Sequence, residues 1–177
     1  MTVYGPGGMP GQGLNESGQG RPIRAATAAD VDAIERLVER AYGGYVERLG
    51  IEPGPMRDDY SQRIAEADAF VVVDEGAVIA LLILVARPDH LLIENIAVDP
   101  SRQGEGIGRR LMTFAEERAR ATELTRLRLY THELMSENLA LYARLGYRED
   151  ERRDVRVFLS KDLGLSRDAC AGCGRRP

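Results

Sequence analysis

The chain has 177 residues, of which 44% are hydrophobic and 29% charged, and this composition indicates one globular domain. Its formal net charge of −4 disfavours a general nucleic-acid-binding protein, which would be basic. The longest apolar run, residues 77–86, is much shorter than the roughly 20 residues of a membrane span. We therefore expect neither a nucleic acid nor a membrane among its partners.

The two ends of the chain differ in composition from its middle. Residues 1–20 are rich in glycine and proline and predict a flexible tail, without the apolar segment of a secretory signal. Residues 164–177 are small and polar and predict a second loose tail, in which Cys170 and Cys173 form an incidental pair rather than a zinc or redox site. We expect one folded domain over residues 21–163, in the cytoplasm.

The first half of this domain predicts an edge strand, two helices and a hairpin. Thr27 is a suitable N-cap for the first helix, whose apolar spacing ends near Gly43 and Gly44. Asp74-Glu75-Gly76 lies between two apolar runs and is typical of a hairpin turn. The expected elements are strands over 21–25, 70–74 and 77–86, and helices from Thr27 to about Gly43 and over 57–67.

The second half alternates strands and helices. A third apolar run is ended by Asp99-Pro100, and a glycine-rich segment then opens an amphipathic helix. The expected elements are strands over 91–98 and 126–131, helices from Ile107 and over 136–145 with Gly146 at the end, and two last strands from near Tyr147 and around 155–159. This order predicts a single α/β domain of mostly antiparallel strands with helices on both faces.

The glycine-rich segment Gly104-Glu105-Gly106-Ile107-Gly108 suits the binding of an oligophosphate. Glycines let the backbone approach an anion, and the N–H groups of a helix start point at it. The dinucleotide fingerprint fails because Arg109 stands where its third glycine would be, and the P-loop fails because no lysine follows a glycine here. The residues alone leave open which phosphate ligand this is, or whether the segment is only a glycine-rich turn.

Three segments together resemble the GNAT superfamily of acyl-CoA-dependent N-acyltransferases. Gln103-x-x-Gly106-x-Gly108 is similar to the superfamily's pyrophosphate-binding signature, Q/R-x-x-G-x-G/A. Residues 94–100 resemble its fourth strand and the turn that follows, and residues 138–147 resemble its last helix and the start of the next strand. The resemblance covers residues 21–161.

This resemblance implies an α/β (α+β) fold, a mixed sheet of six to seven strands with a β-bulge and a splay at the fourth strand. It implies acetyl-CoA as co-substrate and no metal. The backbone of Ile96, Ala97 and Val98 would pair with pantetheine, and Asn138 would contact coenzyme A. The pyrophosphate would lie against Arg102, Gln103, Gly104, Glu105, Gly106, Ile107, Gly108 and Arg109.

The resemblance also implies a direct attack of a primary amine on the thioester. Glu94 is the expected general base, with His132, Glu133 or a water as alternatives, and Tyr142 is the expected acid for the departing thiolate. The acceptor pocket is expected between residues 41–60 and the loop after Tyr130. Tyr42, Tyr45 and Tyr60 are either its walls or packing residues.

The expected function is N-acetylation of a small molecule or peptide. The partners are acetyl-CoA and an amine acceptor, and a homodimer is compatible with the resemblance. Two alternatives stay open, namely a non-catalytic module that binds or senses acyl-CoA, and a protein N-acetyltransferase. The loss of turnover but not of binding on replacing Tyr142 with Phe would distinguish a catalyst from a sensing module.

Overall fold

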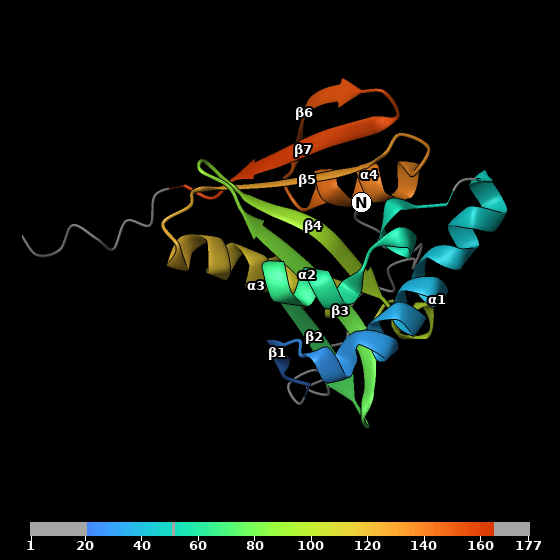
Figure 1. The fold of residues 1–177 in the computed structure, drawn as a ribbon. Coiled ribbons are helices and arrows are strands. Elements are labelled where there is room, and N and C mark those ends of the chain that lie inside the picture. Colours follow the sequence, from blue (N-terminus) through green and yellow to red (C-terminus); the bar gives the residue numbers. More distant parts are fainter. Residues whose placement is uncertain (1–20, 51, 165–177) are drawn as a thin grey trace, which may run out of the picture.

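The computed structural model describes residues 21–50 and 52–164 (Figure 1). The predictions for residues 1–20, and for the second tail with Cys170 and Cys173, lie outside the described residues apart from Gly164. Within the described part, no helix is long and apolar enough to cross a membrane.

The described residues form a mixed sheet of seven strands in the order β1-β2-β3-β4-β5-β7-β6. Only β4 and β5 pair in parallel, and the other neighbours are antiparallel, as the strand pattern predicts. The strands are β1 (Ile23–Ala25), β2 (Asp68–Asp74), β3 (Ala77–Ala86), β4 (Leu91–Val98), β5 (Arg126–His132), β6 (Arg148–Arg153) and β7 (Arg156–Asp162).

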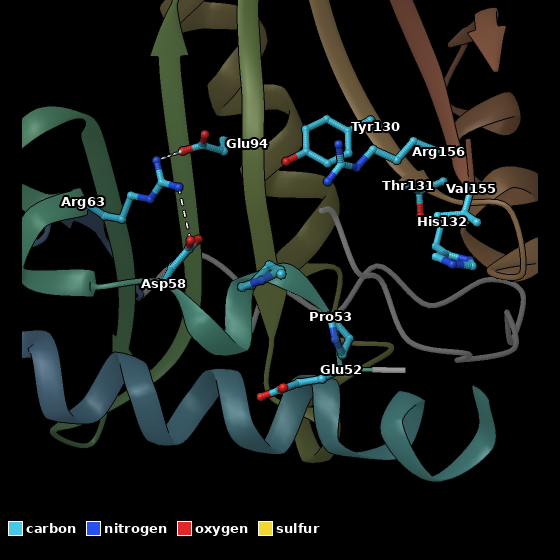
Figure 2. A pocket seen from close by; sticks show the side chains of 12 residues that line it. Glu52, Pro53, Asp58, Arg63, Glu94, Tyr130, Thr131, His132, Val155 and Arg156 are labelled. Carbon is cyan, nitrogen blue, oxygen red and sulfur yellow. Dashed lines mark hydrogen bonds and ion pairs between the residues drawn. The ribbon is translucent and has the colours of Figure 1, made fainter. Parts of the chain in front are cut away.

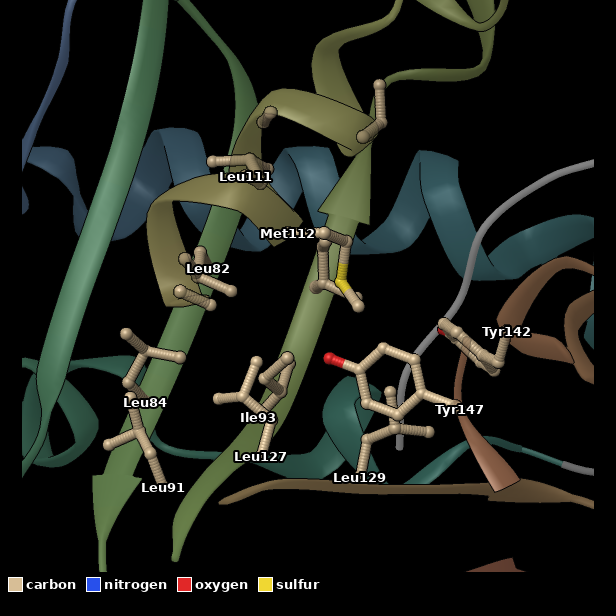
Figure 3. Packing of buried hydrophobic residues seen from close by; sticks show 14 of the residues in the cluster. Leu82, Leu84, Leu91, Ile93, Leu111, Met112, Leu127, Leu129, Tyr142 and Tyr147 are labelled. Atoms are coloured by element: carbon tan, nitrogen blue, oxygen red, sulfur yellow. The ribbon is translucent and has the colours of Figure 1, made fainter. Parts of the chain in front are cut away.

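Helices cover both faces of the sheet, so the middle strands are buried on two sides. Along β3, Leu81 and Ile83 pack under α1 (Val31–Leu49) and α2 (Tyr60–Glu66). Leu82 and Leu84 pack on the other face, under α3 (Ile107–Ala121; Figure 3). This double burial explains why β3 is apolar without alternation. The helices are α1 (Val31–Leu49), α2 (Tyr60–Glu66), α3 (Ile107–Ala121) and α4 (Ser136–Arg144).

The first helix is longer than its sequence predicts. The expected end at Gly43 and Gly44 is wrong, because α1 continues to Leu49 and ends at Gly50, whose φ is 64°. Each internal glycine costs about 1 kcal/mol. Tyr45 is 5% exposed, and burial of its ring on the far side of the glycine pair offsets that cost.

The other predicted elements are confirmed with small shifts. The helix expected over 57–67 begins at Tyr60, where the Asp59 carboxylate accepts a hydrogen bond from the Gln62 N–H at 3.0 Å. Residues 54–57 form a separate 3-10 turn before it. Glu75 and Gly76 form the expected two-residue hairpin, both with positive φ, and Gly146 follows α4 with a φ of 87°.

Strand β4 carries the bulge and the splay that the resemblance implies. Ile83 faces Asn95 and Leu84 faces Ile93, so Glu94 is an extra residue without a partner on β3. On its other edge β4 pairs with β5 only over Leu91–Ile93. Beyond this point the two strands separate, and a cleft opens where they do.

Candidate active site

A cleft of about 420 Å³ opens where β4 and β5 diverge, on the face of the sheet that α1 and α2 cover (Figure 2). Its walls come from the segment before α2, from α2, β4, the end of β5 and the β6–β7 turn. The lining residues are Glu52, Pro53, Gly54, Pro55, Asp58, Arg63, Glu94, Tyr130, Thr131, His132, Val155 and Arg156. Both segments expected to form the acceptor pocket therefore contribute to this cleft.

The bulge turns Glu94 into the cleft. Glu94 contacts Arg63 of α2, and its neighbour Asn95 contacts the tyrosines of α1 and α2, so two consecutive residues face the same side. The Glu94 carboxylate accepts a hydrogen bond from Arg63 Nη1 at 2.9 Å, and Arg63 Nη2 donates to Asp58 at 3.1 Å. With 15% of its side chain exposed, Glu94 is held in place and still reached from the cleft.

Tyr130 of β5 lies opposite Glu94, and Figure 2 shows its hydroxyl directed toward that carboxylate. Burial, and then the negative charge of Glu94, raise the pKa of Tyr130. At neutral pH its phenol is therefore protonated, and it serves as a hydrogen-bond donor in the cleft rather than as a base.

The alternative bases differ in their access to the cleft. His132 lines it, but its Nδ1 accepts a hydrogen bond from the Leu134 N–H at 3.2 Å. A neutral imidazole that accepts at Nδ1 carries its proton on Nε2, so His132 presents a donor. Glu133 is exposed and does not line the cleft.

A buried polar chain holds the bulge from behind. The Tyr42 hydroxyl donates to Asn95 Oδ1 at 2.6 Å, Asn95 Nδ2 donates to the Tyr60 oxygen at 3.1 Å, and Tyr60 donates to the Pro55 carbonyl at 2.8 Å. The three side chains are at most 2% exposed. Tyr42 and Tyr60 are thus packing residues, not pocket walls. Sequence reasoning missed Asn95, whose amide in an apolar strand was the available signal.

Tyr142 and Asn138 lie inside the domain on α4. Tyr142 is fully buried in the core beneath α3 and packs edge-to-face on Tyr147 with ring centroids 6.0 Å apart (Figure 3). Asn138 is also fully buried, hydrogen-bonds Tyr45 and donates from Nδ2 to the Met135 sulfur at 3.5 Å. Glu94 and Tyr142 therefore face opposite sides of the sheet.

The glycine-rich loop is shaped for close approach of a ligand. Gly104 and Gly106 have φ of 88° and 77°, in the left-handed region that side chains disfavour. The N-cap of α3 is Gly106, which has no side chain to cap the helix, so the N–H groups of the first turn are directed out of the helix start. A small hollow lined by Val98, Arg102, Gln103, Gly104, Ile107 and Gly108 joins this loop to the end of β4.

Some of the charged side chains around this loop form ion pairs within the protein. Arg102 pairs with Asp74 at 2.8 Å and with Glu105 at 3.4 Å, and Arg21 pairs with both acids too. The hydrogen bond from Arg21, and then that from Arg102, hold the pKa of Glu105 below its usual range. Arg109 is exposed. In the described part of the chain, no three His, Cys, Asp or Glu residues gather to hold a metal ion.

Past the bulge, β4 offers only its backbone to the gap. Ile96, Ala97 and Val98 have buried side chains, and one edge of this segment pairs with residues 80–82 of β3. The other edge is not paired with β5. An extended ligand could add to this edge as a strand does, through main-chain donors and acceptors.

Comparison with known proteins agrees with this geometry. N-alpha-acetyltransferase 80 of Mus musculus is 43% identical to the chain over 80 residues, which are 45% of this chain and 24% of that protein. The chain thus spans about a quarter of the length of this curated relative. The model of the acetyltransferase (GNAT) family matches residues 31–147.

Solved structures show the same fold. PaiA N-acetyltransferase from Thermoplasma acidophilum, crystallised with coenzyme A, has a TM-score of 0.72 at 15% identity, over 81% of this chain and 99% of that one. The ribosomal-protein-S18-alanine N-acetyltransferase of Escherichia coli has a TM-score of 0.69 at 21% identity, over 84% and 97%. Because the family model spans more than half of the chain, the protein belongs to the acetyltransferase (GNAT) family.

Proposed function

We propose that this acetyltransferase moves the acetyl group of acetyl-CoA to a primary amine, by direct attack within a ternary complex. One observation carries the proposal. The single bulge at Glu94 turns a carboxylate into the cleft on one face of the sheet and separates β4 from β5. The unpaired edge of β4 then leads to the glycine-rich loop. A site for the amine and a path for the thioester therefore meet at one residue.

The loop and the strand edge are the proposed binding site for acetyl-CoA, which supplies the activated acyl group as its thioester. The N–H groups from Gly104 to Arg109 would hold the pyrophosphate, with Gln103 and Arg102 alongside and the exposed Arg109 as a further cation. The backbone of Ile96 to Val98 would pair with pantetheine. An N–H near Ile96 is a suitable donor for the oxyanion that develops during attack.

Glu94 is the proposed general base. An alkylammonium has a pKa of about 10.4, so well under 1% is free amine at neutral pH and its proton must be removed. Glu94 lines the cleft and is oriented by Arg63, so it can take this proton directly or through a water. His132 is a weaker candidate, because its accepting nitrogen already binds a backbone N–H.

Tyr142 is the proposed acid for the departing thiolate. It lies on the α3 side of the sheet, away from the carboxylate that receives the amine proton, so the two proton transfers use different faces. Asn138 is one turn earlier on α4, and its contacts with Tyr45 and Met135 steady that helix. We propose that Asn138 contacts coenzyme A from this position on α4.

The acceptor is a small molecule or a peptide. The cleft is open between two loops and can take either. The mouse relative is named as an N-alpha-acetyltransferase, which supports the α-amine of a peptide or protein as one acceptor class to test.

The experiment is thiol release from acetyl-CoA with a panel of primary amines. Glu94→Gln and Tyr142→Phe should each lower kcat/KM by at least about 100-fold, the usual contribution of a general base or acid. Acetyl-CoA should still raise the Tm of both variants. Glu133→Gln, at an exposed glutamate outside the cleft, is the matched control and should keep its turnover. Thiol release unchanged in Glu94→Gln would contradict the assigned base. Acetyl-CoA binding by the wild type without turnover of any amine would favour the sensing module.

A further inference from the structure

The acidic side chains of the cleft are all ion-paired within the protein. Glu52 pairs with Arg57 at 2.7 Å, and Arg63 pairs with both Asp58 and Glu94. Two guanidinium groups thus offset two of the three carboxylate charges. A further guanidinium in the cleft, outside these pairs, is available to bind an acceptor.

Arg156 is this further guanidinium. It lines the cleft from the first position of β7, and its side chain is exposed. Within the part of the chain that the structure describes, no carboxylate lies within ion-pair distance of its guanidinium. Its guanidinium carbon lies over the ring of Tyr130 instead, 5.5 Å from the centroid (Figure 2). A guanidinium held in this way keeps N–H donors that can bind a carboxylate through two hydrogen bonds.

A second donor stands beside Arg156. His132 of β5 is its partner in the β5–β7 register, and both side chains line the same cleft. Because His132 accepts the Leu134 N–H at Nδ1, its Nε2 carries a proton. The β5–β7 side of the cleft therefore offers a guanidinium and an N–H donor, while the β4 side offers the Glu94 carboxylate.

We propose that the preferred acceptor carries a carboxylate, which binds Arg156 and His132 while the amine of the same molecule faces Glu94. This inference rests on the function proposed above and adds the substrate class. Glu94 and Arg156 line the same cleft on either side of Tyr130, whose hydroxyl is directed toward Glu94 and whose ring lies beneath Arg156, so one small acceptor can reach both. An amino acid with a short spacer, or a peptide with an acidic residue at its amino end, can span them.

The test compares acceptors of equal length with and without the carboxylate. Glycine, β-alanine, γ-aminobutyrate and ε-aminocaproate are each assayed against the corresponding carboxamide, and an amidated Asp-Ala dipeptide against Asn-Ala, by thiol release at saturating acetyl-CoA. The wild type should favour the carboxylate member of at least one pair by about 10- to 100-fold in kcat/KM, as for a charge-assisted hydrogen bond. The spacer with the largest preference measures the distance between the two ends of the cleft.

Variants assign the preference to Arg156. Arg156→Gln should raise KM for the carboxylate acceptor and abolish the preference, and Arg156→Glu should reverse it, so that each carboxamide becomes a better acceptor than its carboxylate. The control is Arg153→Gln, because Arg153 faces Arg156 across the β6–β7 hairpin, pairs with Glu151 and does not line the cleft.

Two results would contradict the inference in different ways. Equal rates within every pair, or a preference that survives Arg156→Gln, would overturn this inference and leave amine acetylation standing. If none of the amines in the panel, charged or neutral, supported thiol release, the proposed function and the inference would be overturned together.

Discussion

Asn95 links the fold to the site, and replacing it should cost both stability and activity. It follows Glu94 in the bulge and joins Tyr42 of α1 to Tyr60 of α2 through its amide. We predict that Asn95→Leu, which keeps the volume but removes the amide, lowers the free energy of unfolding and also lowers turnover, because the carboxylate beside it loses its support.

The size of the effect follows from the two hydrogen bonds that are lost. Tyr42 loses the acceptor of its hydroxyl proton at a site with no exposure, which costs about 1–3 kcal/mol. Tyr60 loses a donor but still donates to Pro55, which costs about 0.5–1.5 kcal/mol. The expected loss is about 2–4 kcal/mol, or roughly 4–16 °C in Tm for a domain of this size.

A double-mutant cycle that combines Asn95→Leu with Tyr42→Phe isolates the energy of the hydrogen bond between these two residues. Urea unfolding followed by far-ultraviolet circular dichroism is the assay, since the chain has no tryptophan. Tyr42→Phe in the Asn95→Leu background should cost less than it does alone, because the acceptor is already gone. A loss below about 1 kcal/mol in Asn95→Leu, or strictly additive variants, would refute the reasoning.

Three further predictions concern single positions. The Tyr147 hydroxyl is buried without a hydrogen-bond partner among the described residues, so Tyr147→Phe should raise the unfolding free energy by about 1 kcal/mol in urea unfolding, and a lower value would contradict this. Gly44 lies exposed within α1 with open space at its Cβ, so Gly44→Ala should raise Tm by an amount equivalent to about 0.5–1 kcal/mol, and a lower Tm would show that α1 needs the glycine. Hydrogen bonds from Arg24 lower the pKa of Asp30, so its stabilisation is present above about pH 4 and is lost as pH falls through the lowered pKa. Asp30→Asn should therefore lower the unfolding free energy by about 1–3 kcal/mol at pH 7 and reduce its pH dependence between pH 4 and 2. The same pH dependence in this range as in the wild type would contradict the assignment to Asp30.

Most of the fold was predictable because local signals agree with the tertiary structure. The apolar run at 91–98 coincides with β4, and the glycines before Ile107 coincide with the start of α3. The end of α1 was predicted wrongly, because glycine propensity is a local quantity whereas the burial of Tyr45 depends on the rest of the domain.

The site was less predictable from its residues than from the resemblance. A bulge leaves no mark in the alternation of β4, since all but two of its side chains are buried. The ion pair of Glu94 joins residues 31 positions apart, and Arg156 comes from the far hairpin, so neither contact has a signal in spacing. Tyr42 and Tyr60 illustrate the same limit, because only the structure distinguishes packing residues from pocket walls.

The central claim is that the loop from Gly104 to Gly108 and the open edge of β4 bind acetyl-CoA. The most direct measurement is thermal unfolding with acetyl-CoA, with free coenzyme A and NAD as comparisons. A ligand at about 100 times its Kd stabilises by about 2.7 kcal/mol, and Tm should then rise by roughly 5–10 °C. We predict this shift with acetyl-CoA and coenzyme A and none with NAD. No shift at millimolar acetyl-CoA would contradict the account.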